Sequence, residues 1–389
     1  MRLNAFSGIS SGQPPGELKS LLEKAFANSR RRVARPLPFI EHKFPDLAEL
    51  AEILRLSSES GYWTNFGPVC SLLESALERY LNLPPSRKVV MCSSGTAALF
   101  TWIAVKQYQA GRKLRWVVSA YGFPSTYIGP LADAAVLDCD RAATLDLQAL
   151  ARLHPDTWDG VVLTNVFGLR PDVRDYLELC GNLGKELVVD NAGLLGGFER
   201  EDSRWQVDEV LSFHQTKPWG MGEGGCAVVS NDIAPLFREL TNPGLALAGA
   251  ARAGASNSKI SDFSCALILQ RLLRAPEWSC AYREQARRVL GIALDCGLIP
   301  LAPLDLSTLT PPHLPLLAPR VLAETDLVNQ TVVLHKYYRP LSGSAPNAWD
   351  IYRRIVNVPC HPGMAALADD EIARGLGSIV SGAHATRTG

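Results

Sequence analysis

Seven short apolar runs, separated by turn residues and by stretches of helical periodicity, constrain the fold of this chain more than any other feature. The runs are KVVMC, RWVVSA, AAVLD, GVVLTNV, KELVVD, EVLSF and CAVVS. Apolar runs of this length are typical of strands that are buried on both faces. Helical patterns such as GTAALFTWIAVKQY and PDVRDYLELCGNLG lie between several of them. The series predicts an α/β domain with a mostly parallel sheet and crossover helices.

The length of the chain and a change of pattern near residue 245 predict more than one domain. A single core seldom grows beyond about 250–300 residues, and this chain has 389. We expect an N-terminal arm over residues 1–43, a large α/β domain over 44–245 and a smaller α+β domain over 246–389. The arm carries a basic cluster, Arg30 to Arg32, which is either a solvated charged face or a contact for a substrate phosphate.

Local patterns predict the elements on both sides of the apolar runs. Upstream, LAELAEILRL and SLLESALERYL have helical periodicity and flank the turn-rich loop GYWTNFGP. Downstream, helical segments are predicted at residues 262–273 and 284–294. A proline-rich connection, LIPLAPLDLSTLTPPHLPLLAP, then leads to the strand-like segment TVVLHKYYRPL and a last helix.

The composition excludes several classes of protein. Lys plus Arg and Asp plus Glu both number 39, so the basic excess of nucleic-acid-binding proteins is missing. The nine cysteines contain no C-x-x-C pair, which fits neither a disulfide framework nor a zinc site. No apolar run is long enough to span a membrane, and the N-terminus lacks the apolar region of a secretion signal. We therefore expect a soluble, cytoplasmic protein without a metal ion.

Small and polar residues follow the first apolar run, in the segment MCSSGTAAL, where a helix is predicted to begin. In open α/β sheets, ligands bind at the carboxyl ends of the strands. Gly95 and its neighbours Ser93, Ser94 and Thr96 let backbone N–H groups approach an anion, and a helix N-terminus attracts negative charge. The segment favours a phosphate cradle, although Ser and Thr at a helix start also serve as plain N-caps.

Two later runs end at or near side chains that could bind a cofactor or react with it. The run ELVVD ends on Asp190, and a buried carboxylate requires a cation or hydrogen-bond donors. A protonated pyridine nitrogen is such a partner; a helix cap or an internal salt bridge is the alternative. The run EVLSF ends at Ser212 and Phe213, and Lys217 follows five residues after the serine. A lysine with a lowered pKa forms Schiff bases, whereas most lysines are simply solvated.

The segments SSGTAAL, FPST, DNAG and SFHQTK with GEGG occur in this order along the chain. Their order resembles that of the DegT/StrS-type family of nucleotide-sugar aminotransferases, which depend on pyridoxal 5'-phosphate (PLP). The resemblance runs from about Gly61 to Val358, and the S-x-x-x-x-K and GEGG signature is its most specific part. GYWTNFGP, GASNSKISDFSCALILQRL, YYRPL and VNVPCHPGM resemble further landmarks of the family. The resemblance implies the fold type I architecture of PLP-dependent aminotransferases.

The resemblance also implies roles for individual residues. Lys217 would form the Schiff base with PLP and shuttle protons, and Asp190 would keep the pyridine nitrogen protonated. Asn257 would reach the cofactor phosphate of the neighbouring subunit, which implies a homodimer with shared active sites; alternatively, it caps the helix that begins near Ser261. The remaining contacts would be to the cofactor phosphate (Gly95, Thr96 and Ser212) and to the two faces of the ring (Phe123 and Ala192).

Three positions depart from the family pattern. Gly193 stands where Gln or His commonly contacts the ring hydroxyl, so that contact must be lost or replaced. Lys259 stands where Arg is more usual, which keeps the charge but removes a bidentate fork. Ser119 replaces the usual proline before FPST.

The implied activity is transfer of an amino group, from glutamate, to a keto sugar carried on a nucleotide. Related proteins that dehydrate sugars replace the lysine, so Lys217 favours transamination. Alternatives are amination of a non-sugar ketone, sugar dehydration, and a catalytically silent protein that binds a partner. The presence of Lys217, Asp190 and Ser212 together argues against the silent protein.

Overall fold

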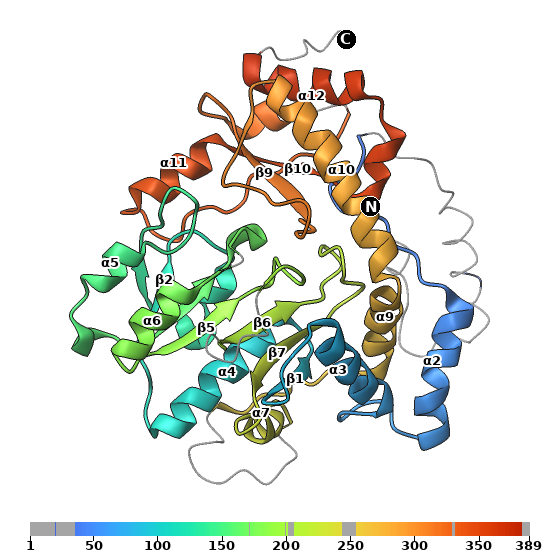
Figure 1. The fold of residues 1–389 in the computed structure, drawn as a ribbon, viewed down its shortest axis with the longest axis vertical. Coiled ribbons are helices and arrows are strands. Elements are labelled where there is room, and N and C mark those ends of the chain that lie inside the picture. The colour runs from blue at the N-terminus through green and yellow to red at the C-terminus, as the bar shows by residue number, and fades with distance from the viewer. Residues whose placement is uncertain are drawn as a thin grey trace.

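The computed structural model describes residue 20 and residues 36–382, apart from 171, 199, 201–205, 243–253 and 329–330. Within this part of the chain, a seven-stranded sheet forms the centre of the larger body (Figure 1). Its strands are β1 (Arg87–Cys92), β2 (Trp116–Ser119), β3 (Ala135–Leu137), β4 (Gly160–Thr164), β5 (Glu186–Asp190), β6 (Asp208–Ser212) and β7 (Gly225–Ser230).

Each of the seven predicted apolar runs forms one of these strands. Across the sheet the order is β1-β7-β6-β5-β4-β2-β3. Strands β2 to β6 pair in parallel, whereas β7 pairs antiparallel with both β1 and β6. The predicted α/β fold with a mostly parallel sheet is therefore confirmed. Because β1, β2, β4, β5 and β6 share one direction, their carboxyl ends meet at the same edge of the sheet.

Helices cover both faces of this sheet, which explains why its strands are apolar throughout. On one face, α4 (Gly95–Ala110) and α7 (Ala234–Thr241) pack against the strands. On the other face lie α3 (Pro68–Tyr80), α6 (Arg174–Asn182) and α9 (Asp262–Leu273). The same body contains α2 (Leu47–Ser60), beside α3 and α9, and the short α5 (Leu147–Ala151). None of the described helices is long and apolar enough to cross a membrane.

The loop before α3 is shaped by a buried carboxylate at the start of α9. Asp262 accepts hydrogen bonds from the backbone N–H groups of Val69 and Cys70, both at 3.1 Å, and from the Ser57 hydroxyl at 2.6 Å. A Cβ at Gly67 would lie 2.5 Å from Asp262 Oδ2. Gly67, the second glycine of GYWTNFGP, therefore lets Asp262, which is 193 positions after Val69, cap α3.

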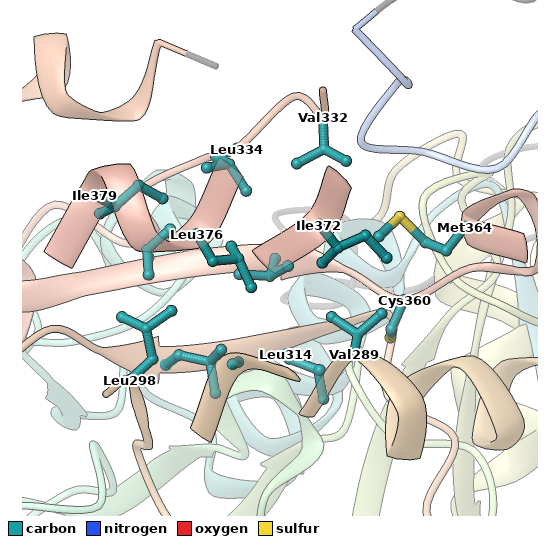
Figure 2. Close-up of a cluster of buried hydrophobic side chains, with 14 of the residues drawn as sticks. Val289, Leu298, Leu314, Val332, Leu334, Cys360, Met364, Ile372, Leu376 and Ile379 are labelled. Atoms are coloured by element: carbon teal, nitrogen blue, oxygen red, sulfur yellow. The ribbon is translucent and has the colours of Figure 1, made fainter. Parts of the chain in front are cut away.

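A smaller antiparallel sheet forms the centre of the second body. Its strands are β8 (Ile299–Pro300), β9 (His313–Leu317) and β10 (Ile355–Pro359), in the order β10-β9-β8. Its helices are α10 (Ala275–Asp295), α11 (Pro346–Arg354) and α12 (Asp369–Ser381). Figure 2 shows side chains of α10, β9 and α12 meeting in one core, among them Val289, Leu314 and Leu376. The α+β character predicted for the C-terminal part is confirmed.

One predicted strand is wrong. The segment TVVLHKYYRPL, residues 331–341, forms only isolated bridges, of Val332 with Leu37 and of His335 with Asn357. The second sheet instead uses HLPLL (β9), which lies in the predicted proline-rich connection, and IVNVP (β10). A proline cannot donate to a ladder and argues against a central strand. Pro315, which pairs with Asn357 of β10, is therefore the reason why β9 was not predicted as a strand.

Two predictions about domain limits fall on residues outside the described part. The boundary at 245/246 lies within 243–253. The basic cluster Arg30 to Arg32 lies within 21–35, and most of the predicted arm lies within 1–19 and 21–35. Helix α9 and the first turn of α10 share the core beside the seven-stranded sheet. From Tyr282 onward, α10 contributes to the core of the second sheet. We therefore propose that the two domains meet along α10.

Candidate functional site

A cavity of about 400 Å³ lies at the carboxyl ends of the parallel strands. Strand-end residues form part of its wall, and Pro312, His313, Tyr337 and Tyr338 of the second domain complete it. The predicted site residues that line the cavity are Gly95, Thr96, Phe123, Asp190, Ala192, Ser212 and Lys217. The tertiary structure thus brings together all the predicted site residues except Asn257.

The first turn of α4 borders the cavity. Its N-cap is Ser94, whose hydroxyl accepts the N–H of Ala97 at 3.1 Å, so this serine is a plain cap. The N–H groups of Gly95 and Thr96 belong to the first turn, where a helix offers them no acceptor of its own. A Cβ at Gly225 would collide with the nitrogen of Gly95, so the last glycine of GEGG lets β7 run directly behind the helix start. This corner is suited to a phosphate.

Asp190 is a buried carboxylate, 5% exposed, at the end of β5. Its Oδ1 accepts the N–H of Ala192 at 3.0 Å. Burial raises the pKa of Asp190, while this hydrogen bond and the charge of Lys217 act in the opposite direction. No ion pair within the described ranges compensates the carboxylate. The internal salt bridge, one of the alternatives for Asp190, is thus not formed there, and a cation in the cavity would stabilise the charge.

Lys217 belongs to a closed loop between β6 and β7. The N–H of Phe213 donates to the carbonyl of Gly224 at 2.8 Å, which joins the two ends of the loop. Phe213 and Trp219, two aromatic residues of this loop, are buried in the core beside the sheet. Burial lowers the pKa of the Lys217 amine, and the Asp190 carboxylate acts in the opposite direction. The lysine therefore has the environment that favours a neutral, nucleophilic amine.

A second lysine, Lys43 from the segment before α2, holds the same loop. Its ammonium donates to the carbonyl oxygen of Gly220 at 2.8 Å and to that of Lys217 itself. The Glu41 carboxylate lies 4.0 Å from the Lys43 nitrogen and pairs with Arg271 at 2.6 Å. Burial lowers the pKa of Lys43 to about 7, and the Arg271 charge adds to this effect. Lys43 thus ties the N-terminal segment to the backbone of Lys217.

Aromatic side chains from the loops after β2 and β4 and from the second domain form another part of the wall, together with a buried histidine. Tyr338 stacks on Phe167, with ring centroids 5.4 Å apart, and meets Phe123 edge-on at 6.0 Å. His313 packs edge-on against Phe167 at 5.1 Å. Burial lowers the pKa of His313 to about 3, and the Lys217 charge adds to this effect. The imidazole is therefore neutral at physiological pH.

The DegT/DnrJ/EryC1/StrS aminotransferase family has a sequence model that matches residues 46–294. The chain belongs to this family. Protein Rv3402c of Mycobacterium tuberculosis (strain ATCC 25618 / H37Rv) is 31% identical over 256 residues, or 61% of this chain and 60% of that protein. The L-glutamine:2-deoxy-scyllo-inosose aminotransferase of Streptoalloteichus tenebrarius is 26% identical over 281 residues, or 66% of this chain and 64% of that enzyme. The chain therefore matches about 60% of the length of these curated relatives.

The fold extends beyond the region matched by sequence. The crystal structure of DesI, determined in the presence of its TDP-sugar product, superimposes with a TM-score of 0.72 at 22% identity. The superposition covers 92% of this chain and 96% of DesI. The fold type I architecture predicted from the order of the motifs is confirmed.

The cavity fits PLP, the cofactor of this aminotransferase family. Two polar atoms in its wall, Thr164 Oγ1 and His313 Nδ1, are buried and have no hydrogen-bond partner in the described part of the chain. Buried polar atoms are rarely left without a hydrogen-bond partner, so the wall of the cavity is suited to a ligand with polar groups. The Asp190 carboxylate, the Lys217 amine and the first turn of α4 match the ring nitrogen, the aldehyde and the phosphate of PLP.

Gly193, where the family commonly has Gln or His, has no room for a side chain. A Cβ at this position would lie 2.8 Å from the nitrogen of Gly168 and 2.9 Å from the carbonyl carbon of Phe167. Phe167 and Gly168 form a turn with positive φ angles of 57° and 72°. This turn occupies the space that a side chain at residue 193 would need. The usual contact to the ring hydroxyl therefore cannot come from this position.

Asn257 lies outside the cavity of its own chain. It is exposed, and its amide oxygen accepts a hydrogen bond from the Lys259 ammonium. Helix α9 is capped by Ser261, whose hydroxyl accepts the N–H of Ser264 at 3.3 Å. The alternative interpretation, that Asn257 caps this helix, is therefore wrong. The predicted contact with a neighbouring subunit stays a prediction.

Several residues that line the cavity carry little or no signal in the sequence. Thr164 ends β4, but the predicted run GVVLTNV continues for two more residues, so the strand-end rule that selected Asp190 did not single it out. His313 lies in β9, whose prolines argue against a strand. Tyr338 lies in the segment 331–341, which was wrongly predicted to be a strand. Lys43 had no signal, because a lone lysine ahead of a helix forms no pattern.

Proposed function

We propose that this protein is a PLP-dependent aminotransferase that delivers an amino group from an amino acid to the keto group of a sugar. The observation that carries the proposal is the meeting of Lys217, Asp190 and the first turn of α4 in one cavity. These supply an amine of lowered pKa, a carboxylate that has no ion pair with any described residue, and a phosphate cradle, the groups that PLP chemistry needs. Membership of the aminotransferase family supports the same activity.

The chain's own residues would hold and orient the cofactor. PLP, when bound, supplies an electron sink for the negative charge that develops on the substrate carbon. The N–H groups of Gly95 and Thr96 and the Ser212 hydroxyl would bind the phosphate. Asp190 would keep a proton on the ring nitrogen, because a positive partner stabilises a buried carboxylate. Ala192 would support that carboxylate through its N–H and pack against the ring.

Lys217 would act as the general acid and base. Its lowered pKa favours the neutral amine, which could take a proton from the substrate carbon and return it to the carbon that carried the aldehyde of PLP, on the other side of the linking nitrogen. Phe123 would pack on the ring face away from Ala192. Tyr338 and the neutral His313 would exclude water from this space, so the proton stays between the amine and the substrate.

The substrates are proposed from the family resemblance, with glutamate as donor and a nucleotide-linked keto sugar as acceptor. The TDP-sugar product present with DesI supports an acceptor of this class. A second candidate is a free cyclic ketone, because the name of the relative from S. tenebrarius specifies an inosose as acceptor and L-glutamine as donor. Lys217 weighs against sugar dehydration and against a silent binding protein.

Following the two half-reactions separately tests this proposal. Protein loaded with PLP is mixed with L-glutamate or L-glutamine, and loss of the visible absorption of the cofactor reports transfer of the amino group. We expect at least one donor to bleach the protein, and a nucleotide-linked keto sugar to restore the colour. Colour that persists with both donors contradicts aminotransfer. Restoration by a free cyclic ketone alone selects the second candidate.

We also propose a homodimer whose active sites are completed by Asn257 from the partner. Its exposed position outside the cavity of its own chain supports this assignment. Mixing an Asn257→Asp protein with a Lys217→Ala protein should restore activity after subunit exchange, although each variant alone is strongly impaired. The heterodimer has one site with both defects and one with neither, because a two-fold interface makes the exchange reciprocal. Verified exchange without recovered activity would mean that Asn257 acts within its own chain.

A further inference from the structure

Thr164 carries a buried hydroxyl that the described part of the protein leaves without a partner. Its side chain is 7% exposed, lines the cavity, and its Oγ1 makes no hydrogen bond to any described residue. A buried hydroxyl in this state costs free energy, because it has lost its bonds to water and gained none. A ligand atom that meets the hydroxyl would remove this cost.

The position of Thr164 relative to Asp190 indicates which ligand atom this is. In the parallel ladder between β4 and β5, Thr164 pairs with Asp190, and paired residues project from the same face of a sheet. Strand β6, which ends in Ser212, pairs with β5 along its other edge. Thr164 and the phosphate cradle therefore flank Asp190 from opposite sides.

The covalent structure of PLP then decides which substituent faces β4, an argument that rests on the proposed function. The hydroxyl and the phosphate arm are attached on either side of the carbon that bears the aldehyde. They therefore point to opposite sides of the line from the ring nitrogen to the aldehyde. With the nitrogen at Asp190, the aldehyde at Lys217 and the phosphate near Ser212, the ring hydroxyl would face β4.

Other groups on the β4 side are engaged elsewhere. The amide nitrogen of Asn165 donates to the carbonyl of Arg170 at 2.7 Å and to Asn191 Oδ1 at 2.8 Å. Its amide oxygen accepts the N–H of Arg170 at 2.8 Å. Gly193 has no side chain and no room for one. A Cβ at Gly122 would lie 3.5 Å from Thr164 Oγ1, so the glycine leaves this hydroxyl accessible.

We propose that Thr164 is a positioning residue whose hydroxyl donates a hydrogen bond to the ring oxygen of PLP, in place of the side chain that Gly193 lacks. The ring oxygen is negatively charged and attracts the proton on the nitrogen that links PLP to Lys217. A donated hydrogen bond withdraws part of that charge and weakens the attraction. Thr164 therefore lowers the pH at which the linking nitrogen loses its proton.

A pH titration of the visible absorption of the loaded protein tests this role. Thr164→Val keeps the shape of the side chain and removes the hydroxyl, whereas Thr164→Ser keeps the hydroxyl. We expect the titration midpoint to rise by about one pH unit in the valine variant, a tenfold change in proton affinity, and to stay near the parent value in the serine variant. An unchanged midpoint in fully loaded Thr164→Val overturns the proposal. A titration midpoint that shifts in His313→Phe and not in Thr164→Val also overturns the proposal.

Thermal unfolding gives a second readout that does not depend on activity. Without PLP, Thr164→Val should unfold at the same or a higher temperature than the parent, because the hydroxyl that it removes has no partner. With PLP, its unfolding temperature should rise less than that of the parent, because the ligand has lost a contact. The matched control is Thr101→Val, which removes a buried hydroxyl 3.4 Å from Ser258 Oγ.

The control separates a missing ligand contact from a missing contact within the protein. Thr101→Val should lower the unfolding temperature and leave the titration midpoint unchanged. If Thr164→Val without PLP loses as much stability as Thr101→Val, its hydroxyl is bonded within the protein and the proposal falls. A parent protein that shows no visible band with PLP contradicts the proposed function itself. If the parent is coloured and Thr164→Val has the same titration midpoint and the same rise in unfolding temperature with PLP, only the role of Thr164 is contradicted.

Discussion

Replacing Lys217 with alanine should abolish covalent attachment of PLP and lower the rate of amino transfer by at least about 10²–10⁴-fold, the range that one general acid–base supplies. The amine of Lys217 lines the cavity. The nearby Lys43 is not an obvious substitute, because its ammonium is held by the carbonyl oxygens of the Lys217 loop. We therefore expect the variant to bind PLP reversibly, if at all, and to lack the visible band.

Borohydride reduction followed by peptide mass spectrometry locates the attachment. The parent protein should carry the reduced phosphopyridoxyl mass on the peptide that contains Lys217, and the alanine variant should carry none. Lys43→Met is a useful control variant, because it removes the hydrogen bonds that Lys43 donates to the loop and leaves the amine of Lys217 in place. It should still be labelled at Lys217. A label on any other lysine of the parent protein would remove the basis of the assignment.

Replacing Asp190 with asparagine should slow the half-reaction with the amino donor by about 10²–10³-fold, the usual effect of deleting one electrostatic contact to a reacting group. Asparagine cannot hold a positive charge on the ring nitrogen, and a neutral ring is a poor electron sink. PLP should still bind through Lys217 and the phosphate cradle. Single-turnover measurements with the donor report the rate. A rate near that of the parent protein would exclude the proposed role of Asp190.

The stability of the Asp190 variant without PLP shows whether the loss of rate reflects misfolding. Burial raises the pKa of Asp190, so keeping the carboxylate ionised at neutral pH costs the folded parent free energy that asparagine does not cost. Asp190→Asn should then unfold at the same or a higher temperature than the parent at neutral pH. The difference should shrink as the pH falls through the raised pKa of the folded state and should be gone below about pH 4, where the carboxyl is protonated in the folded and the unfolded chain.

The central sheet and the cavity residues near the ends of its strands were predictable because their signals are local. An apolar run such as ELVVD indicates a buried strand, and the residue that ends it, Asp190, lies at the edge where ligands bind. The segments around Gly95 and Lys217 follow the same rule. The second sheet was harder to predict, because Pro315 interrupts the pattern of β9 and two residues of β8 form no pattern.

The amino-acid sequence by itself determined the strands of the large domain and the reactive groups at their ends, because a strand and its terminal residue are encoded within a few positions. Only the tertiary structure decided that Gly193 has no room for a side chain, that Thr164 has no partner among the described residues, and that His313 closes the cavity. Lys43 holds the loop of Lys217 from 174 positions away. Such contacts depend on register and packing between distant segments, and neither is encoded in a local pattern.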